Sequence, residues 1–426
     1  MERIQKIKGT HDILPDRSGD WRYVENAIHR VMRCYGYQEI RTPAFEATAL
    51  FARGIGQLTD IVSKEMYTFE DRGKKSITLK PEGTAPVIRA YIENSLGEKR
   101  PLNKLYYISP MFRQENPQAG RFRQFHQFGA ELIGSPAPFA DVETILNILD
   151  IYRSLGLSSF VVKLNSVGDE NCREHYKAAL RDFLRPRLHL LCKTCQERFE
   201  KNPMRIFDCK EEGCIAESQD APRMIDYLDE ASAQHFHGVR ALLDQHGIAY
   251  QLDHRLVRGL DYYTRTAYEV ISNSLGSQNA LGGGGRYDLL AQELGGKPTP
   301  AVGYAAGIER LLMVLAEENL LPDTGLSLDV FIATIGEKAQ EWASKTVRLL
   351  RKNGISADMD LLGRSLKAQM KEANRSNAKF ALLAGEQELT TGKLTLRDLQ
   401  HSEQSEIDAH DLATQLKNVL SRRSEK

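Results

Sequence analysis

The sequence lacks a long apolar run and an excess of charge of either sign. No apolar stretch approaches the roughly 18 residues that a membrane-spanning helix needs, and no apolar signal core follows the first residues, Met1 to Lys6. Lys plus Arg and Asp plus Glu both number 57, so the formal net charge is zero. We expect a cytoplasmic protein with no membrane partner, in which any nucleic-acid binding depends on local basic patches.

Cysteine is scarce, with six residues in a chain of 426, which excludes a disulfide-rich scaffold. Four of the six cluster, as a Cys-x₂-Cys pair at Cys192 and Cys195 and a Cys-x₄-Cys pair at Cys209 and Cys214. Four thiolates at such spacing can form a tetrahedral structural Zn²⁺ site, which would stabilise a charged segment with little core. Reduced free thiols and disulfides are the alternatives, and the spacing does not decide among the three.

Length and composition indicate more than one domain, since 426 residues with 41% hydrophobic content exceed a single ordinary core. We expect a first domain over residues 1–325, interrupted by a charged, helical insertion at about 171–245. A second domain over 326–426 follows a linker-like segment at 321–325. Its alternating strand and helix patterns predict a small α/β domain with a mixed sheet.

The most informative segment runs from Tyr107 to Glu131. Two strand-like stretches, Leu105–Glu115 and Arg121–Ile133, surround a turn at 116–120. Side chains alternate between the faces of a strand, so a symmetric turn would collect on one face Arg113, Glu115, Arg121, Arg123, Phe125, Gln127 and Glu131. Arginine forks suit phosphate groups and a flat ring suits a purine, which indicates a nucleotide site. A solvated sheet face of mixed charge is the alternative.

A run of four glycines, Gly282 to Gly285, also attracts attention. It is not followed by Lys and Ser or Thr, so it is not a Walker-type phosphate loop. A close approach of the backbone to a ligand and a structural turn are the two interpretations that remain.

Several segments resemble the class II aminoacyl-tRNA synthetases. Phe112–Glu115 together with Gly120–Phe125 resembles motif 2, and Gly303–Leu311 resembles motif 3. The region Tyr35–Pro43 is a candidate for motif 1, which builds the dimer interface in that family.

Other segments are similar to the histidyl-tRNA synthetases in particular. Leu256–Thr266 and Leu281–Asp288 resemble their two histidine-specific signatures, Lys80–Thr84 resembles the amino-acid-binding loop, and Gly9–Asp12 and Gln124–Gln127 also fit. The resemblance implies an α+β catalytic domain of the class II synthetase fold, built on a mostly antiparallel sheet with a helical insertion. It implies a C-terminal α/β anticodon-binding domain with a mixed sheet.

The activity that this resemblance implies is ATP-dependent ligation of L-histidine to tRNA(His) by a homodimer. ATP, with Mg²⁺, would convert histidine to histidyl-adenylate, and transfer to tRNA would release AMP after pyrophosphate. The alternative is a non-catalytic, histidine-sensing regulatory subunit of ATP phosphoribosyltransferase. Such paralogues typically lack the Arg-Gly-Leu-Asp-Tyr-Tyr signature, here Arg258–Tyr263, and the anticodon domain.

The resemblance also implies roles for individual residues. Arg113 and Arg258 would be catalytic at the α-phosphate, and the residues that bind ATP would be Arg113, Glu115, Phe125 and Arg310. The histidine-binding set would be Glu82, Thr84, Arg113, Gln127, Glu131, Arg258, Tyr262, Tyr263 and Tyr287. The acceptor end of tRNA would meet Gln118, Arg121 and Arg123. We expect Arg258 inside a strand, because an apolar, strand-like run surrounds it.

Overall fold

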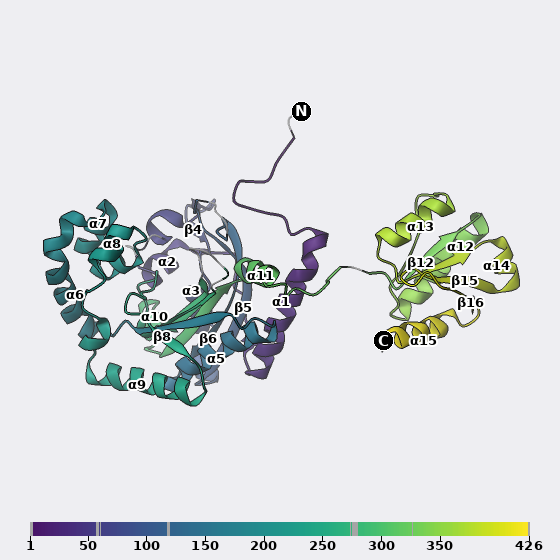
Figure 1. Cartoon of the computed structure of the whole chain (residues 1–426). Helices are drawn as coiled ribbons and strands as arrows, with labels where there is room; N and C mark the ends of the chain where they lie inside the picture. Colours follow the sequence, from purple (N-terminus) through teal and green to yellow (C-terminus); the bar gives the residue numbers. More distant parts are fainter. Residues whose placement is uncertain are drawn as a thin grey trace. The chain divides into compact units, whose positions relative to one another are not determined.

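The computed structural model describes residues 3–56, 59, 61–116, 120–272, 274, 280–325 and 327–424. The chain divides into two compact units, Met1–Pro322 and Asp323–Lys426 (Figure 1). Each unit has hydrophobic clusters of its own. None of the helices in the described ranges is long and apolar enough to cross a membrane.

The first unit is built on an eight-stranded sheet in the order β1-β5-β6-β11-β10-β9-β7-β8. The strands are β1 Gln38–Glu39, β5 Asn103–Phe112, β6 Gln124–Ile133, β7 Phe160–Ser166, β8 Tyr250–Leu252, β9 Thr264–Ser272, β10 Ala280–Arg286 and β11 Ala301–Gly307. Only the two outermost pairs, β1 with β5 and β7 with β8, are parallel in the described sheet. The predicted mostly antiparallel sheet is confirmed.

Four helices contribute to the main core on this sheet: α1 Pro15–Cys34, α5 Pro138–Ser154, α9 Glu230–Gln245 and α11 Ile308–Glu317. Helix α1 shows why the sequence folds this way. Pro15 at its start has no N–H to leave unpaired, and Gly36, with φ +74°, follows its end. Val24, Ile28 and Val31 recur at helical spacing and are buried.

A smaller sheet with the order β2-β4-β3 belongs to the same unit. Its strands are β2 Phe45–Ala47, β3 Thr68–Glu70 and β4 Ser76–Leu79. The short elements that accompany it are α2 Thr48–Gly54, a π-helical turn Ile61–Glu65, α3 Thr84–Glu93, α4 Leu96–Lys99 and α10 Leu290–Glu293. Helix α3 of this part begins at Thr84, which lines the main cavity of the unit.

A helical lobe lies between β7 and α9 in the chain. It consists of α6 Glu170–Leu184, α7 Lys193–Lys201, α8 Glu212–Glu217 and the 3₁₀ turns Arg185–Leu190, Pro203–Asp208 and Met224–Tyr227. Figure 1 shows α6, α7 and α8 gathered at one end of the unit. Helix α9, which the sequence grouped with this insertion, instead packs on α5 and contributes Phe236, Val239 and Leu243 to the main core.

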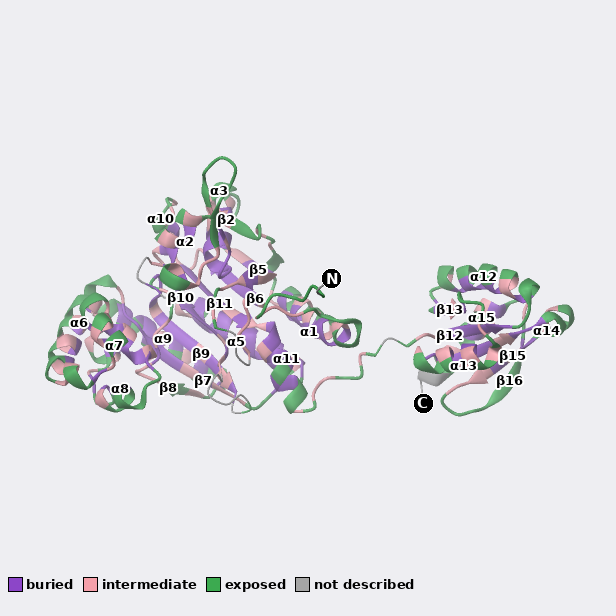
Figure 2. Ribbon diagram, turned by 90° about the horizontal axis from the view of Figure 1, so that it is seen from above, coloured by how far each residue is buried: buried purple, intermediate pink, exposed green. Residues whose placement is uncertain are grey.

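The second unit has a five-stranded mixed sheet in the order β13-β12-β14-β15-β16. The strands are β12 Val330–Thr334, β13 Ala357–Met359, β14 Phe380–Ala384, β15 Lys393–Asp398 and β16 Gln404–Asp408, and the helices are α12 Glu337–Lys352, α13 Leu366–Arg375, α14 Glu386–Thr391 and α15 Leu412–Ser424. Strand β12 is parallel to both of its neighbours, β13 and β14, whereas the pairs β14–β15 and β15–β16 are antiparallel. The predicted mixed sheet is confirmed, and Figure 2 shows its central strands buried.

The sequence did not predict β16 or α14. Strand β16 is the edge of its sheet, and Ile407 is its one buried residue. An edge strand with solvent on its outer side needs few apolar residues, so it lacks the alternation by which strands are recognised.

The predicted hairpin strands are longer than the observed ones, because β5 ends at Phe112 and β6 begins at Gln124. The predicted register is nevertheless correct. Phe112 pairs with Gln124, and the Arg113 N–H donates to the Arg123 carbonyl at 2.9 Å. Charged residues occupy the positions at which regular pairing gives way to the loop.

A buried ion pair stabilises the junction of α5 and β10. Arg286 and Asp141 are both fully buried, and Arg286 Nε donates to Asp141 Oδ1 at 3.2 Å. Arg286 also donates to the carbonyls of Ser135, at 2.9 Å, and Ala137, at 3.2 Å. Burial alone would raise the pKa of Asp141, but the charge of Arg286 holds it below its usual range.

We predict that Asp141→Asn destabilises the first unit by about 2–3 kcal/mol, because it removes the fully buried carboxylate that pairs with Arg286 and leaves only the partly exposed Asp288, 3.0 Å away, as counter-ion. Urea unfolding followed by circular dichroism measures this loss. Asp226→Asn is the matched control, since Asp226 pairs with Arg223 in an exposed position and should change stability by less than about 1 kcal/mol. Equal stability of the two variants would contradict the prediction.

Candidate functional site

A cavity of about 400 Å³ lies in the first unit, where segments distant in the sequence meet. Its walls come from the start of α3, the β5–β6 hairpin, the loop before β9, the glycine run of β10 and the β11–α11 junction. The predicted site residues that line it are Glu82, Thr84, Arg113, Glu115, Arg121, Phe125, Gln127, Arg258, Tyr262, Tyr263 and Arg310. The structure therefore brings together most of the residues that the sequence singled out.

Arg258 lies in an irregular loop between β8 and β9, so its predicted position inside a strand is wrong. Side chains from distant segments hold the carbonyls of this loop. Asn165 Nδ2 donates to the Leu256 carbonyl at 2.9 Å, and Arg205 Nη2 donates to the Gly259 carbonyl at 2.8 Å. These bonds replace the ladder that a neighbouring strand would have supplied.

The Arg258 guanidinium sits against an aromatic ring and a carboxylate. Its Cζ lies 5.3 Å from the centre of the Tyr263 ring, and Nη1 lies 3.4 Å from Glu269 Oε1. Burial alone would lower the pKa of Arg258, but Tyr263 and Glu269 raise it above its ordinary value. Arg258 Nε is buried and has no hydrogen-bond partner among the described residues. A positive group with a spare donor at a cavity wall suits an anionic ligand.

The glycine run forms the interior of β10, so the interpretation as a turn is wrong. Gly282 and Gly283 line the cavity. A Cβ at Gly283 would lie 2.5 Å from Arg258 Nη1, which leaves no room for a side chain beside the guanidinium. The missing side chains thus let Arg258 lie against the sheet and let a ligand approach the backbone.

A second arginine, Arg113, is fixed at the end of β5. Its Nε donates to the Pro81 carbonyl at 2.9 Å, and its Cζ lies 5.3 Å from the centre of the Phe125 ring. Glu115 lies between two arginines, with Oε1 3.7 Å from Arg113 Nη1 and Oε2 3.4 Å from Arg121 Nη1. A flat ring beside the Arg113 guanidinium, in a cavity that Arg121 also lines, suits a purine that carries phosphates.

Arg310, at the start of α11, lines the same cavity. Its Nε donates to the Gly120 carbonyl at 3.1 Å and its Nη1 to the Ala280 carbonyl at 3.0 Å. Burial lowers the pKa of Arg310, although a guanidinium remains charged at any physiological pH. The side chain therefore bridges the hairpin loop and β10 while its charge borders the cavity.

The residues predicted to contact tRNA differ in whether they line the cavity. Arg121 lines the cavity and Arg123 does not, while Gln118 lies outside the described residues. The Arg123 N–H donates to the Gly9 carbonyl at 2.7 Å, and the rings of His11 and Phe122 lie 4.7 Å apart. The segment Gly9–Asp12 thus contacts the hairpin.

A buried polar cluster adjoins the cavity. Glu131 has no exposed surface; Thr84 Oγ1 donates to its Oε1 at 2.7 Å, and the Tyr287 hydroxyl donates to its Oε2. Glu131 and Tyr287 do not line the cavity themselves but reach it through Thr84 and through Tyr262, whose ring lies 5.6 Å from that of Tyr287. Burial raises the pKa of Glu131 to about 8, although the two hydroxyl donors lower it.

Glu82 and Gln127 complete the polar side of the cavity. The Glu82 carboxylate accepts the N–H groups of Thr84, at 2.7 Å, and Ala85, at 2.9 Å, so it caps the start of α3. Burial raises the pKa of Glu82 despite these bonds. Gln127 Oε1 and the Tyr107 hydroxyl are buried and have no partner in the described part of the chain. Of the two, Gln127 lines the cavity, so its Oε1 is available to a ligand there.

Sequence reasoning missed three acidic residues that line the cavity, Asp208, Glu269 and Glu309. Glu269, the counter-ion of Arg258, lies in a strand of mixed composition that also contains Arg265 and two threonines, so no local pattern marked it as a site residue. Glu309 follows the β11–α11 junction, and its Oε1 accepts the His126 N–H at 2.8 Å. It lies in the segment that resembles motif 3, so the motif contained the signal.

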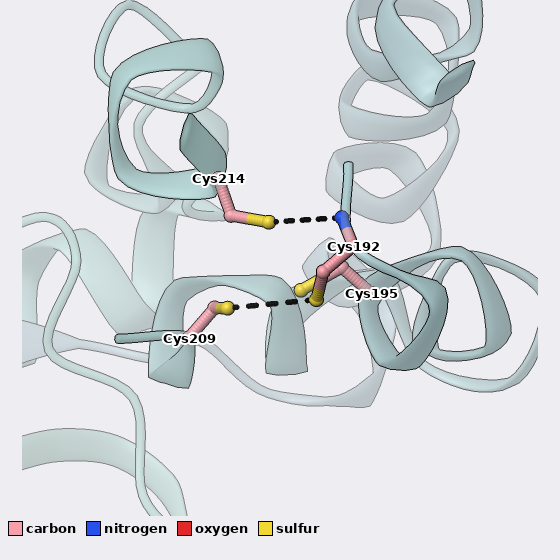
Figure 3. Close-up of side chains that lie close together, drawn as sticks. All are labelled: Cys192, Cys195, Cys209 and Cys214. Atoms are coloured by element: carbon pink, nitrogen blue, oxygen red, sulfur yellow. Dashed lines mark hydrogen bonds between the residues drawn. The ribbon is translucent and has the colours of Figure 1, made fainter. Parts of the chain in front are cut away.

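The four clustered cysteines do not line this cavity. Their sulfur atoms lie close together in the helical lobe (Figure 3).

Comparison with known proteins agrees with this geometry. A family model described as histidyl-tRNA synthetase matches residues 9–311, and one described as anticodon binding domain matches residues 329–419. A histidine–tRNA ligase from Chloroherpeton thalassium is 51% identical over 97% of this chain and 98% of its own length.

Solved structures are similar as well. The apo histidyl-tRNA synthetase of S. aureus has a TM-score of 0.83 and 42% identity, covering 97% of this chain and 100% of its own. A Bacillus halodurans protein described as an ATP phosphoribosyltransferase regulatory subunit/histidyl-tRNA synthetase has a TM-score of 0.65, covering 90% of this chain and 99% of its own. At 22% identity it shows a shared fold alone. The family-model match over residues 9–311 and the relative at 51% identity place this chain in the histidyl-tRNA synthetase family.

Proposed function

We propose that this chain joins L-histidine to tRNA(His) in an ATP-dependent reaction through a histidyl-adenylate intermediate. The observation that carries the proposal is the convergence of Arg113, Arg258 and Arg310 on one cavity. That cavity adjoins the buried cluster around Glu131. The catalytic domain would span 1–325 with its insertion, and the anticodon-binding domain 326–426.

In the first step a carboxylate oxygen of histidine attacks the α-phosphorus of ATP, and the bond to pyrophosphate breaks. The nucleophile belongs to the substrate, so the protein contributes positioning and charge stabilisation. Arg113 and Arg258 would hold the α-phosphate, where negative charge develops, and Arg310 would bind the γ-phosphate. Glu115 would accept a hydrogen bond from the adenine amino group, and Phe125 would stack on the adenine ring.

Mg²⁺ would accompany the β- and γ-phosphates. Glu269 is a carboxylate that lines the cavity beside Arg258, and carboxylate oxygens are the ligands that Mg²⁺ prefers. The ion would neutralise charge on the leaving pyrophosphate.

Histidine would bind between the cavity and the buried cluster. Glu82, Thr84 and Gln127 would hold its α-amino group, and Tyr262, Tyr263 and Tyr287 would surround its ring. Glu131 would accept a ring N–H. A pocket that hydrogen-bonds its substrate rejects isosteres by roughly 10⁴-fold, since a wrong ligand leaves buried polar groups unpaired.

The second step transfers histidine to the terminal adenosine of tRNA(His). Gln118, Arg121 and Arg123 would meet the acceptor end, and the second unit would read the anticodon. We further propose a homodimer that works in the cytoplasm. Support for a dimer comes from β1, an edge strand with exposed residues in the region that resembles motif 1, and from the exposed Ile4 and Ile7.

The regulatory-subunit alternative is less well supported. It accounts for the fold and for histidine binding. It gives no role to the charged Arg258 beside the cavity, nor to a second unit that matches an anticodon-binding family.

The first prediction concerns activation. Histidine-dependent exchange of labelled pyrophosphate into ATP should occur, and Arg258→Ala should lower its kcat at least about 10²–10³-fold because charge stabilisation at phosphorus is lost. Arg223→Ala, which removes an exposed guanidinium in the helical lobe, should keep the wild-type rate. Exchange that depends on a different amino acid, or that occurs without any amino acid, would refute the proposed function.

The second prediction concerns pH. Glu131 has a folded-state pKa of about 8 against 4.5 for an ordinary glutamate. As the pH rises, the Glu131 carboxyl group therefore loses its proton at a lower pH in the unfolded chain than in the folded chain. The stability that neutral Glu131 contributes is fully present below pH 4.5 and declines as the pH rises through 8. The melting temperature of wild type should fall between pH 5 and 9 by a few degrees more than that of Glu131→Gln, measured by differential scanning fluorimetry. Parallel curves would contradict the raised pKa.

The third prediction concerns tRNA. Lys367 and Lys371 are exposed one turn apart on α13, near the exposed Leu361 and Leu362. Lys367→Ala with Lys371→Ala should weaken tRNA binding and reduce the salt slope of log K by about two. Pyrophosphate exchange should not change. Lys393→Ala, which removes a lysine paired with Glu406, is the control; equal effects of the two changes would count against a site on α13.

A further inference from the structure

We propose that Cys192, Cys195, Cys209 and Cys214 bind one Zn²⁺ ion through four thiolates. Their sulfur atoms all lie within 4.8 Å of one another, and those of Cys192 and Cys209 are 3.9 Å apart (Figure 3). In a tetrahedral site with Zn–S bonds of about 2.3 Å, sulfur atoms are about 3.8 Å apart. The described geometry thus differs from that of a zinc site by about an ångström or less.

The local backbone explains how the sulfurs converge. Cys192 precedes α7 and Cys195 lies in its first turn, so one helix end presents both. Cys209 follows the 3₁₀ turn 203–208, and Cys214 lies in α8. The Cys192 N–H donates to Cys214 Sγ at 3.2 Å. N–H donors of this kind stabilise metal-bound thiolates, and the start of α7 favours negative charge.

The alternatives explain less. A disulfide needs sulfur atoms about 2.05 Å apart, whereas Cys192 and Cys209 are nearly twice as far apart and all four residues are free. Ordinary core cysteines pack as small apolar side chains among leucines and phenylalanines. Core packing alone gives no reason for four sulfurs to meet from four positions.

A second group of potential metal ligands differs from the cysteine cluster, because helix capping explains it. Asp169, Cys172 and Asp229 also lie within metal-binding distance of one another. There each carboxylate already has a role, because Asp169 caps α6 and Asp229 caps α9 through backbone N–H groups. The four-cysteine cluster has no such local explanation.

The lobe also needs a cross-link. Helix α7 has nine residues and α8 has six, lengths at which helices are marginal in water. Three of the four cysteines are buried in a cluster with Leu191, Phe199 and Ile206. A metal that joins α7, the 203–208 turn and α8 would fix three short elements at one point.

The same ion would position the loop that carries Arg258, a consequence that rests on the proposed function. Asp208 directly precedes Cys209 and lines the cavity. It accepts a hydrogen bond from Arg205 Nη1 at 2.9 Å, while Arg205 Nη2 donates to the Gly259 carbonyl at 2.8 Å. The chain of contacts therefore runs from a metal ligand to the residue next to Arg258.

A parallel set of contacts starts at Cys214. Its carbonyl accepts the Ser218 hydroxyl at 2.6 Å, and that hydroxyl accepts Arg255 Nη1 at 2.6 Å. Arg255 belongs to the same loop as Arg258. The lobe thus holds the loop at two points, on either side of the catalytic arginine.

Elemental analysis of the full-length protein, purified without chelators, tests the site. We expect about one zinc per chain, released when a mercurial reagent blocks the thiols. Cys209→Ser with Cys214→Ser should contain almost none, whereas Cys34→Ser, which changes an exposed cysteine, should retain it. Wild type without zinc, iron in its place, or zinc retained in the double variant would overturn the proposal.

Cobalt substitution keeps the test decisive if the double variant does not fold. Wild-type protein loaded with Co²⁺ should show the intense visible bands and sulfur-to-metal charge transfer of a tetrahedral thiolate site. Octahedral Co²⁺ absorbs only weakly, so weak bands without charge transfer would overturn the assignment.

The coupling to Arg258 has a separate readout. Removing zinc from the full-length enzyme should lower kcat for histidine-dependent pyrophosphate exchange at least about tenfold while the KM for histidine changes little, and adding Zn²⁺ should restore it. Unchanged kcat after zinc removal would refute the coupling and leave the metal site standing. No exchange from zinc-loaded protein would instead refute the proposed function.

Discussion

The buried carboxyl group of Glu131 constrains the centre of the catalytic unit. It has no exposed surface and accepts hydrogen bonds from Thr84 and Tyr287. Its neighbours across the sheet are Leu105 on β5 and Gly303 on β11, and a Cβ at Gly303 would overlap Glu131 Oε2. A buried polar group without partners costs about 1–3 kcal/mol or more. The start of α3, strand β6, strand β11 and the segment after β10 must therefore meet at one point, and the ligand cavity lies beside it.

The sequence revealed those parts of the site that depend on local patterns. Alternation along Arg113–Glu131 predicted a hairpin with the correct register, since pairing across a short loop follows from the loop itself. The conformation of the Arg258 loop could not be predicted in this way. It depends on Asn165 and Arg205, whose partners in the loop are 91 and 54 residues away in the chain. The apolar run around Arg258 predicted a strand because the residues next to it in the sequence give no sign of those long-range hydrogen bonds.

The glycine run is a second case in which a local pattern did not identify a long-range contact. Four consecutive glycines indicated a close approach, but the sequence did not say of what. The structure shows two approaches at once, with Arg258 Nη1 beside Gly283 and a cavity beside both Gly282 and Gly283. Glu269, which pairs with Arg258, was missed for a related reason. A single acidic residue in a strand that also contains Arg265 and two threonines is ordinarily a solvated position, and only the folded loop makes it a counter-ion.

The arginines that face the cavity are not bare charges. Arg113 and Arg121 share Glu115, and Arg258 has Glu269. In the proposed reaction an incoming triphosphate would compete with these carboxylates for the guanidinium groups, so part of the attraction would be offset by the contacts given up. In the structure each of these arginines has a carboxylate within 4 Å to balance its charge. When pyrophosphate and AMP leave, the carboxylates would pair with the arginines again, and this exchange would favour release of the products over their retention.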